Sequence, residues 1–209
     1  MAKTPDTPDA DETRPPDPLA HPARDRADKL VARAADESTE LTRFEALSQI
    51  AGEYGDRALK NYSQIRNVAQ TLRDSLRDYM CSDGDCTFLV PPSGKFGARD
   101  YGSGAFSVAG KGFLPLEPLS FGLAVRVSDR KDFIRIVMTC RKEADVMYLT
   151  PDNRRPYRLS LPPTEEEIAD VTESIYDYLV DWFASRIDRY DNGTYGNNDI
   201  GFDIVRAAQ

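Results

Sequence analysis

The side chains that most often perform catalysis are scarce in this chain. It has one histidine, His21, and three cysteines among 209 residues. Ser-His-Asp and Cys-His catalysis need a histidine beside a nucleophile, and zinc sites usually draw on several histidines and cysteines. His21 lies in a proline-rich segment without aromatic residues, where little would hold it in place. The sequence therefore predicts no catalytic set, no metal site and no cofactor.

Three local motifs suggest ligand sites, and each departs from the pattern that its chemistry requires. Residues 93–96 contain a Gly-Lys pair, without the earlier glycine and the following hydroxyl of a phosphate-binding loop. Cys81 and Cys86 are spaced more widely than the paired ligands of a zinc ribbon. Residues 191–199 are rich in Asp and Asn but lack the spacing of an EF-hand. All three segments fit turns better than ligand sites.

An enzyme alternative stays open in the glycine-rich segment 93–113, which carries Lys95, Arg99, Asp100 and Tyr101. Loops held by a rigid scaffold often carry catalytic residues. Nothing in this segment pairs a nucleophile with a base, so we expect a protein that is not an enzyme.

Basic residues are concentrated in the middle of the chain, although its formal net charge is -8. Residues 111–158 hold ten Lys and Arg against six Asp and Glu, whereas residues 159–190 hold two against eight. One interpretation is internal compensation, in which the acidic segments neutralise a basic sheet. The other is a site for an anionic partner, because strand alternation places several arginines on one sheet face. Its candidate residues are Arg126, Arg135, Arg141 and Arg158 on that face, with Arg154 and Arg155 at the rim.

The beginning of the chain differs from the rest in composition. Residues 1–22 contain six of the fourteen prolines, and residues 23–37 contain only Leu30 and Val31 as large apolar residues. Such a segment cannot bury enough apolar surface to offset the entropy lost on ordering. We expect residues 1–37 to be a disordered, acidic, proline-rich tail and residues 38–209 to be a single domain.

Two helices are predicted from apolar residues that recur at three- and four-residue spacing. The first follows Ser38 and is long, with a kink or short break at Gly52 and Gly55, since glycine disfavours a helix interior. The second begins at a capping box formed by Thr164 and Glu167 and runs to about residue 189. Its expected apolar face consists of Ile168, Val171, Ile175, Leu179, Trp182 and Ile187.

Between the helices, about five to six short segments have the period of two that is typical of strands. They are separated by polar turns at the spacing of an antiparallel meander. The fold class is therefore α+β, with both helices on the same face of the sheet. The expected strands lie at 87–90, 119–127, 133–141, 146–149 and 157–161, with shorter ones near 105–108 and 202–205.

The order of long helix, sheet and closing helix resembles that of small secretion chaperones, which bind unfolded segments of a partner; the likeness is one of fold order only. We expect a non-enzymatic binding protein, an adaptor, chaperone-like or regulatory module that engages a protein partner or a second copy of itself. The expected contacts to that partner lie on the first helix: Tyr54, Tyr62, Ile65 and Leu72. The alternative is a nucleic-acid-binding accessory protein that uses the arginine face.

The expected location is the cytoplasm. No apolar run reaches the length of a membrane span, and the first residues lack the apolar core of a secretory signal. In that compartment the three cysteines would be reduced thiols.

Overall fold

The structure is a computed structural model that describes residues 42–80, 86–152, 154–194 and 203–206. The chain divides into two compact units, Met1–Gly52 and Glu53–Gln209. Within the first unit the described residues, 42–52, contain only the beginning of the first helix. The predicted tail, residues 1–37, lies outside the described residues.

The long amphipathic helix predicted after Ser38 is α2, Arg43–Met80. It begins with a capping box, because Thr42 Oγ1 accepts from the amide of Glu45 and the Glu45 carboxylate accepts from the amide of Thr42. The helix continues through Gly52 and Gly55, so the break predicted there does not occur. Its buried residues follow the predicted spacing: Ala58, Ile65, Val68, Ala69, Leu72 and Leu76.

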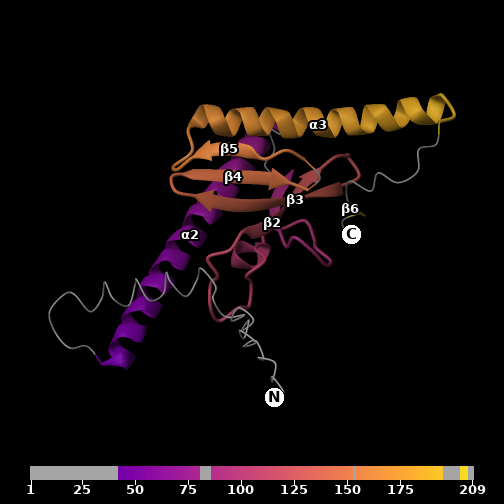
Figure 1. Cartoon of the computed structure of the whole chain (residues 1–209). Coiled ribbons are helices and arrows are strands. Elements are labelled where there is room, and N and C mark those ends of the chain that lie inside the picture. Colours follow the sequence, from indigo (N-terminus) through magenta and orange to yellow (C-terminus); the bar gives the residue numbers. More distant parts are fainter. Residues whose placement is uncertain (1–41, 81–85, 153, 195–202, 207–209) are drawn as a thin grey trace, which may run out of the picture. The chain divides into compact units, whose positions relative to one another are not determined.

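Six antiparallel strands form one open sheet, in which β1 to β5 lie side by side in chain order (Figure 1). The last strand, β6, pairs with the first part of β3, and β4 pairs with the last part of β3. Both therefore lie on the side of β3 that is opposite β2. The strands are β1 Thr87–Val90, β2 Leu119–Arg126, β3 Asp132–Glu143, β4 Val146–Pro151, β5 Tyr157–Ser160 and β6 Asp203–Arg206.

The strand predicted near residues 105–108 is absent. That part of the chain forms a short 3₁₀ helix, η1 Gly102–Ala105, followed by a single bridge between Phe106 and Phe121. Gly102 has a φ of 55°, in the left-handed region that glycine adopts without strain, so the chain turns there instead of extending.

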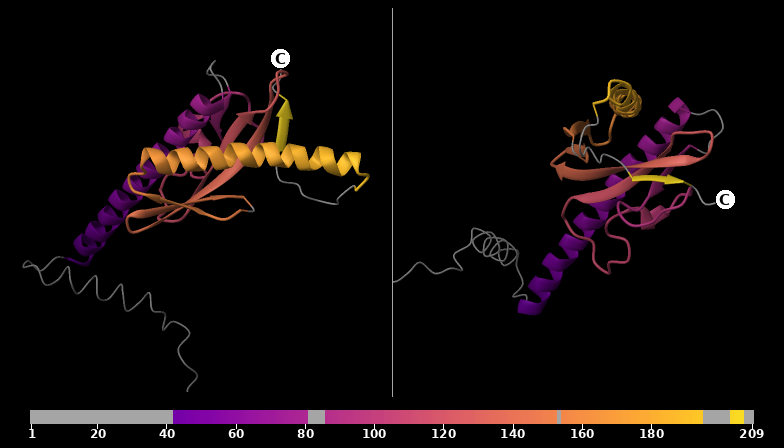
Figure 2. Two further views of the ribbon diagram at one scale, coloured as in Figure 1. Left: turned by 90° about the horizontal axis from the view of Figure 1, so that it is seen from above. Right: turned by 90° about the vertical axis from the view of Figure 1, so that its right-hand side faces the viewer.

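Both helices pack on the same face of the sheet, as predicted. One apolar core contains Leu72 of α2, Ile175 of the second helix, and Leu123 and Ile136 of the sheet, which lie opposite each other on β2 and β3. The two helices also contact each other directly, through a 2.9 Å hydrogen bond between the hydroxyls of Ser75 and Thr172. Figure 2 shows both helices against the sheet from two further directions.

The second helix, α3 Glu165–Asp191, begins at the predicted capping box of Thr164 and Glu167. Ser160 of β5 binds the same carboxylate, with its hydroxyl at 2.7 Å and its amide at 2.9 Å. The hydrogen bonds from Ser160 and Thr164 lower the pKa of Glu167, because they stabilise the charged form. This carboxylate therefore joins the last strand of the meander to the beginning of α3.

The buried face of α3 ends earlier than the sequence predicts. Ile175 and Leu179 are buried, but Trp182 is only half-buried and Ile187 is 60% exposed. The last turns of α3 extend past the strands that its first turns cover (Figures 1 and 2). No described strand lies beneath these turns, in agreement with the exposure of Ile187.

The segment after β1, residues 91–101, covers part of the helix-free face of the sheet. Gly122 permits its close approach, because a Cβ there would lie 2.8 Å from the carbonyl oxygen of Val90 and 2.9 Å from that of Pro91. This segment therefore closes a second, smaller core, whose buried residues are Val90, Phe96, Ala124 and Phe133.

The two described cysteines lie in different environments. Cys140 is buried on the helix-covered face, and loss of hydration raises the pKa of its thiol to about 12. Cys86 is disulfide-bonded, and its partner lies outside the described residues. The expectation of three reduced thiols is therefore wrong for Cys86.

Candidate functional site

The six arginines predicted to bind an anion lie in different environments. Arg135 departs most clearly from the prediction, because it is buried. It is on the helix-free face, as strand alternation predicted, but only 7% of it is exposed. Its guanidinium donates to the carbonyl oxygen of Gly94 at 2.7 Å and of Pro91 at 3.3 Å, and it lies 5.1 Å from the centre of the Phe96 ring. Arg135 therefore holds the covering segment 91–101 in place and presents little surface to a partner.

Arg126 lies at the end of β2, whereas Arg154 and Arg155 follow β4. Arg126 is half-buried and donates to the carbonyl oxygens of Ser128 and Asp129 in the turn after its own strand. Arg154 is exposed and stacks on the ring of Tyr178 of α3, with 3.2 Å between the guanidinium carbon and the ring centre. Arg155 is exposed beside it in sequence. Arg126 and Arg154 thus have contacts within the chain that differ from those of buried Arg135.

Arg141 and Arg158 are the two predicted arginines that the fold brings together. Arg141 lies opposite Tyr148, and Tyr148 lies opposite Arg158, so the three form a row across β3, β4 and β5. Both arginines are exposed, and Arg141 lies 5.1 Å from the centre of the Tyr148 ring. Arg141 also forms an ion pair with Glu143, which is itself exposed. We call Arg141, Tyr148 and Arg158 the arginine row.

The four residues predicted to contact a protein partner belong mainly to the chain's own packing. Ile65 and Leu72 are 0% exposed and lie in the core beneath α2. Tyr62 is half-buried, with its ring edge-on to Phe106. Tyr54 is half-buried as well, and its hydroxyl accepts a hydrogen bond from the amide of Leu116 at 3.0 Å. None of the four forms an exposed apolar surface.

An exposed apolar stripe lies instead on α3 along one border of its buried face, and the sequence prediction missed it. Its residues are spaced by four, three, four and three positions, the spacing that places side chains along one seam of a helix. The signal was present in the sequence, but a second apolar set on the same helix, which faces the sheet, obscured it. We call this set the outer stripe: Tyr176 (38% exposed), Val180 (47%), half-buried Phe183, Ile187 (60%) and Tyr190 (69%).

The surface beside the outer stripe is acidic. Four of the five stripe residues are followed directly by an exposed aspartate, which places a negative row along one flank: Asp177, Asp181, Asp188 and Asp191. Tyr79 of α2 extends the apolar surface, with its ring 5.4 Å from that of Tyr176. Partial burial and the negative charges of Glu173 and Asp177 raise the pKa of Tyr79. The outer stripe is therefore apolar along its centre and negative on one side.

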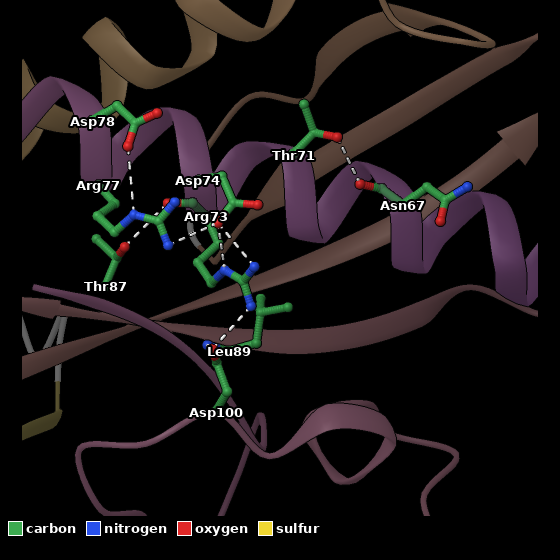
Figure 3. Close-up of polar contacts among 9 residues, drawn as sticks. All are labelled: Asn67, Thr71, Arg73, Asp74, Arg77, Asp78, Thr87, Leu89 and Asp100. Carbon is green, nitrogen blue, oxygen red and sulfur yellow. Dashed lines mark hydrogen bonds and ion pairs between the residues drawn. The ribbon is translucent and has the colours of Figure 1, made fainter. Parts of the chain in front are cut away.

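Asp100, which the enzyme alternative placed in a candidate site, forms structural contacts. Figure 3 shows its carboxylate between Arg73 of α2, at 2.9 Å, and the amide of Leu89, at 2.7 Å. Arg73 also binds Asp74, and the Arg73 carbonyl accepts from the hydroxyl of Thr87. These contacts join α2, β1 and the segment 91–101.

The other residues of that alternative are likewise not arranged around a nucleophile. The hydroxyl of Tyr101 accepts from the amide of Gly97 at 2.9 Å, the Arg99 guanidinium lies 4.9 Å from the Tyr101 ring centre, and Lys95 is exposed.

The described residues contain no group of three or more His, Cys, Asp or Glu side chains that could hold a metal ion. In the same part of the chain, neither helix has the length and apolar character needed to cross a bilayer.

Comparisons with protein-family models, with curated proteins and with solved structures find no match to this chain. The function is therefore argued from the surfaces described above.

Proposed function

We propose that this chain is a non-enzymatic binding protein, with an adaptor, chaperone-like or regulatory role, that engages a protein partner through the outer stripe of α3. The observation that supports this most is the exposure of an apolar seam on α3 that runs beside the face of the helix that packs on the sheet. Exposed apolar residues that gather on one surface of a folded protein often mark a site for a protein partner.

The spacing and charge of this surface favour one kind of partner, an amphipathic helix with basic flanks. Helices recognise one another through apolar residues at alternating spacings of three and four, and charged residues beside the seam select the partner. The aspartates beside Val180 and Ile187 would attract lysine or arginine and would repel an acidic helix.

This proposal is tested with a labelled helical peptide that has leucine at the seam positions and lysine at the flanks. We expect it to bind the unaltered protein and to bind the double variant Val180→Asp, Ile187→Asp at least about tenfold more weakly. Both residues are exposed, so the variant should keep its thermal midpoint within a few degrees. Fluorescence anisotropy measures the affinity, and circular dichroism measures the midpoint.

Leu59→Asp is the matched control, because Leu59 is an exposed apolar residue on α2, away from the outer stripe. It should leave peptide affinity unchanged. The same peptide with glutamate flanks should bind poorly. Equal affinity of the lysine peptide for the unaltered protein and the stripe variant would contradict the proposal. A dimer in sedimentation equilibrium that the stripe variant abolishes would replace the helical partner by a second copy of this chain.

A second candidate function, nucleic-acid binding, is supported by the arginine row. Two exposed guanidiniums on either side of an aromatic ring combine the groups that contact phosphates and bases in single-stranded nucleic acid. The net charge of -8 opposes such binding, because it repels a polyanion at long range.

If this function holds, Arg158→Gln should weaken binding of a short single-stranded oligonucleotide and lower the salt slope by nearly one unit. Arg155→Gln is the control, since Arg155 is exposed but lies outside the row. Filter binding at several salt concentrations gives both values. An unaltered protein that does not retain the oligonucleotide at low salt would eliminate this candidate.

A further inference from the structure

A basic groove lies between α2 and the C-terminal end of β3. No motif was identified there in the sequence. It has a volume of about 430 Å³. Four of its lining residues are cationic, two from each element, and one is acidic: Arg57 and Lys60 of α2, Arg141 and Lys142 of β3, and Glu117. The remaining lining is Asn61, Leu116, Pro118 and Ala144.

Contacts on both sides keep the walls of the groove in position. On one side the Tyr54 hydroxyl binds the amide of Leu116, and the Tyr54 ring stacks on Phe113 at 5.1 Å. On the other side, Lys142 Nζ donates to Gln64 Oε1 at 2.8 Å. The groove therefore exists before any ligand binds, which lowers the ordering cost of binding.

The cations of the groove are only partly neutralised within the chain. Arg57 pairs with Glu53 at 2.8 Å, and Arg141 pairs with Glu143, but all four side chains of these pairs are about half exposed or more. Exposed ion pairs contribute little and exchange readily for another anion. Lys142 binds a neutral amide, and Lys60 has no ion pair or hydrogen bond to any described residue. Two of the four cations thus lack a counter-ion in the described part of the chain.

The side chain of Asn61 places a hydrogen-bond acceptor without a described donor beside the cations of the groove. Its Oδ1 is buried and accepts no hydrogen bond from the described residues. A buried carbonyl oxygen without a donor is destabilising. Because Asn61 lines the groove, a hydroxyl or amino group beside the anionic group of a ligand is the donor that the groove would favour.

We propose that this groove binds a small molecule that carries a phosphate or pyrophosphate group. Two arginines can each bind phosphate oxygens with two parallel N–H donors, and the lysines add point charges. The volume of the groove lies in the range of small-molecule sites. This site is independent of the outer stripe, so either proposal can fail alone.

The experiment is isothermal titration of the full chain with inorganic phosphate, pyrophosphate and AMP at low salt. We expect pyrophosphate or AMP to bind, and we expect Lys60→Gln combined with Arg141→Gln to weaken that binding by about tenfold or more. Arg130→Gln combined with Arg155→Gln is the control for net charge, because both arginines are exposed and neither lines the groove. It should leave the affinity within about twofold.

Three results would overturn the proposal. The first is no heat from any of the three probes at about 10 mM, a concentration that detects even weak sites. The second is an equal loss of affinity in the groove variant and in the control variant Arg130→Gln, Arg155→Gln, which would indicate diffuse attraction by net charge. The third is binding of a single-stranded oligonucleotide without binding of any small probe, which would assign these cations to a nucleic acid.

Discussion

Leu72→Ala should lower the free energy of unfolding by about 2–5 kcal/mol, the range for emptying a buried leucine site. Leu72 is 0% exposed and belongs to the core that α2 shares with the sheet and α3. Removing its side chain leaves a cavity that neighbours from three elements cannot easily fill. Urea denaturation followed by circular dichroism gives the value.

Leu59→Ala is the matched control for this change, since the same residue type lies on the same helix but is 56% exposed. It should cost less than about 0.5 kcal/mol. If Leu72→Ala cost as little as Leu59→Ala, α2 would not pack on the sheet. Its apolar stripe would then be free for a partner, as the sequence alone suggested.

Arg135→Ala should lower the free energy of unfolding by about 2–4 kcal/mol, because it removes a buried guanidinium that donates to two carbonyl groups. Its guanidinium makes two hydrogen bonds to carbonyl oxygens, and hydrogen bonds from a charged group are stronger than neutral ones. The change would also uncover Phe96 and leave both carbonyl groups of the covering segment without this donor. We expect faster proteolysis within residues 91–101 together with the loss of stability.

Arg158→Ala tests the same residue type on the same sheet face, but in an exposed position. Surface substitutions of this kind usually change stability by less than about 0.5 kcal/mol. Chemical denaturation of the two variants in parallel gives the comparison. Equal effects would mean that Arg135 is exposed and that the segment 91–101 does not rest on it.

The fold class followed from local patterns because each pattern has a direct physical cause. Alternation predicted the faces of β2 and β3, and the capping box predicted where α3 begins. These patterns do not show which distant segment of the chain covers a given face of the sheet. Arg135 and Arg158 have the same place in the alternation, yet only Arg135 lies under a segment that comes much earlier in the chain.

The candidate surfaces were harder to predict, because local sequence patterns do not show which distant segments come together. Periodicity marked Ile65 and Leu72 as one apolar side of a helix, but it could not show that the chain's own sheet covers that side. On α3, Ile187 was assigned to the inner face because nothing in the sequence shows where the sheet ends. The groove joins cations from α2 and β3 that are far apart in the chain, so no local motif marks it.

The two outer strands of the meander have a feature in common that bears on self-assembly. An amide at each edge is bound by a carboxylate of the same chain: Leu89 of β1 by Asp100, and Ser160 of β5 by Glu167. Unpaired edge amides are where an additional strand joins a sheet and fibrils begin to grow. A strand from another molecule must first displace these carboxylates. The protection of each edge against strand addition therefore depends on one acidic side chain, Asp100 at β1 and Glu167 at β5.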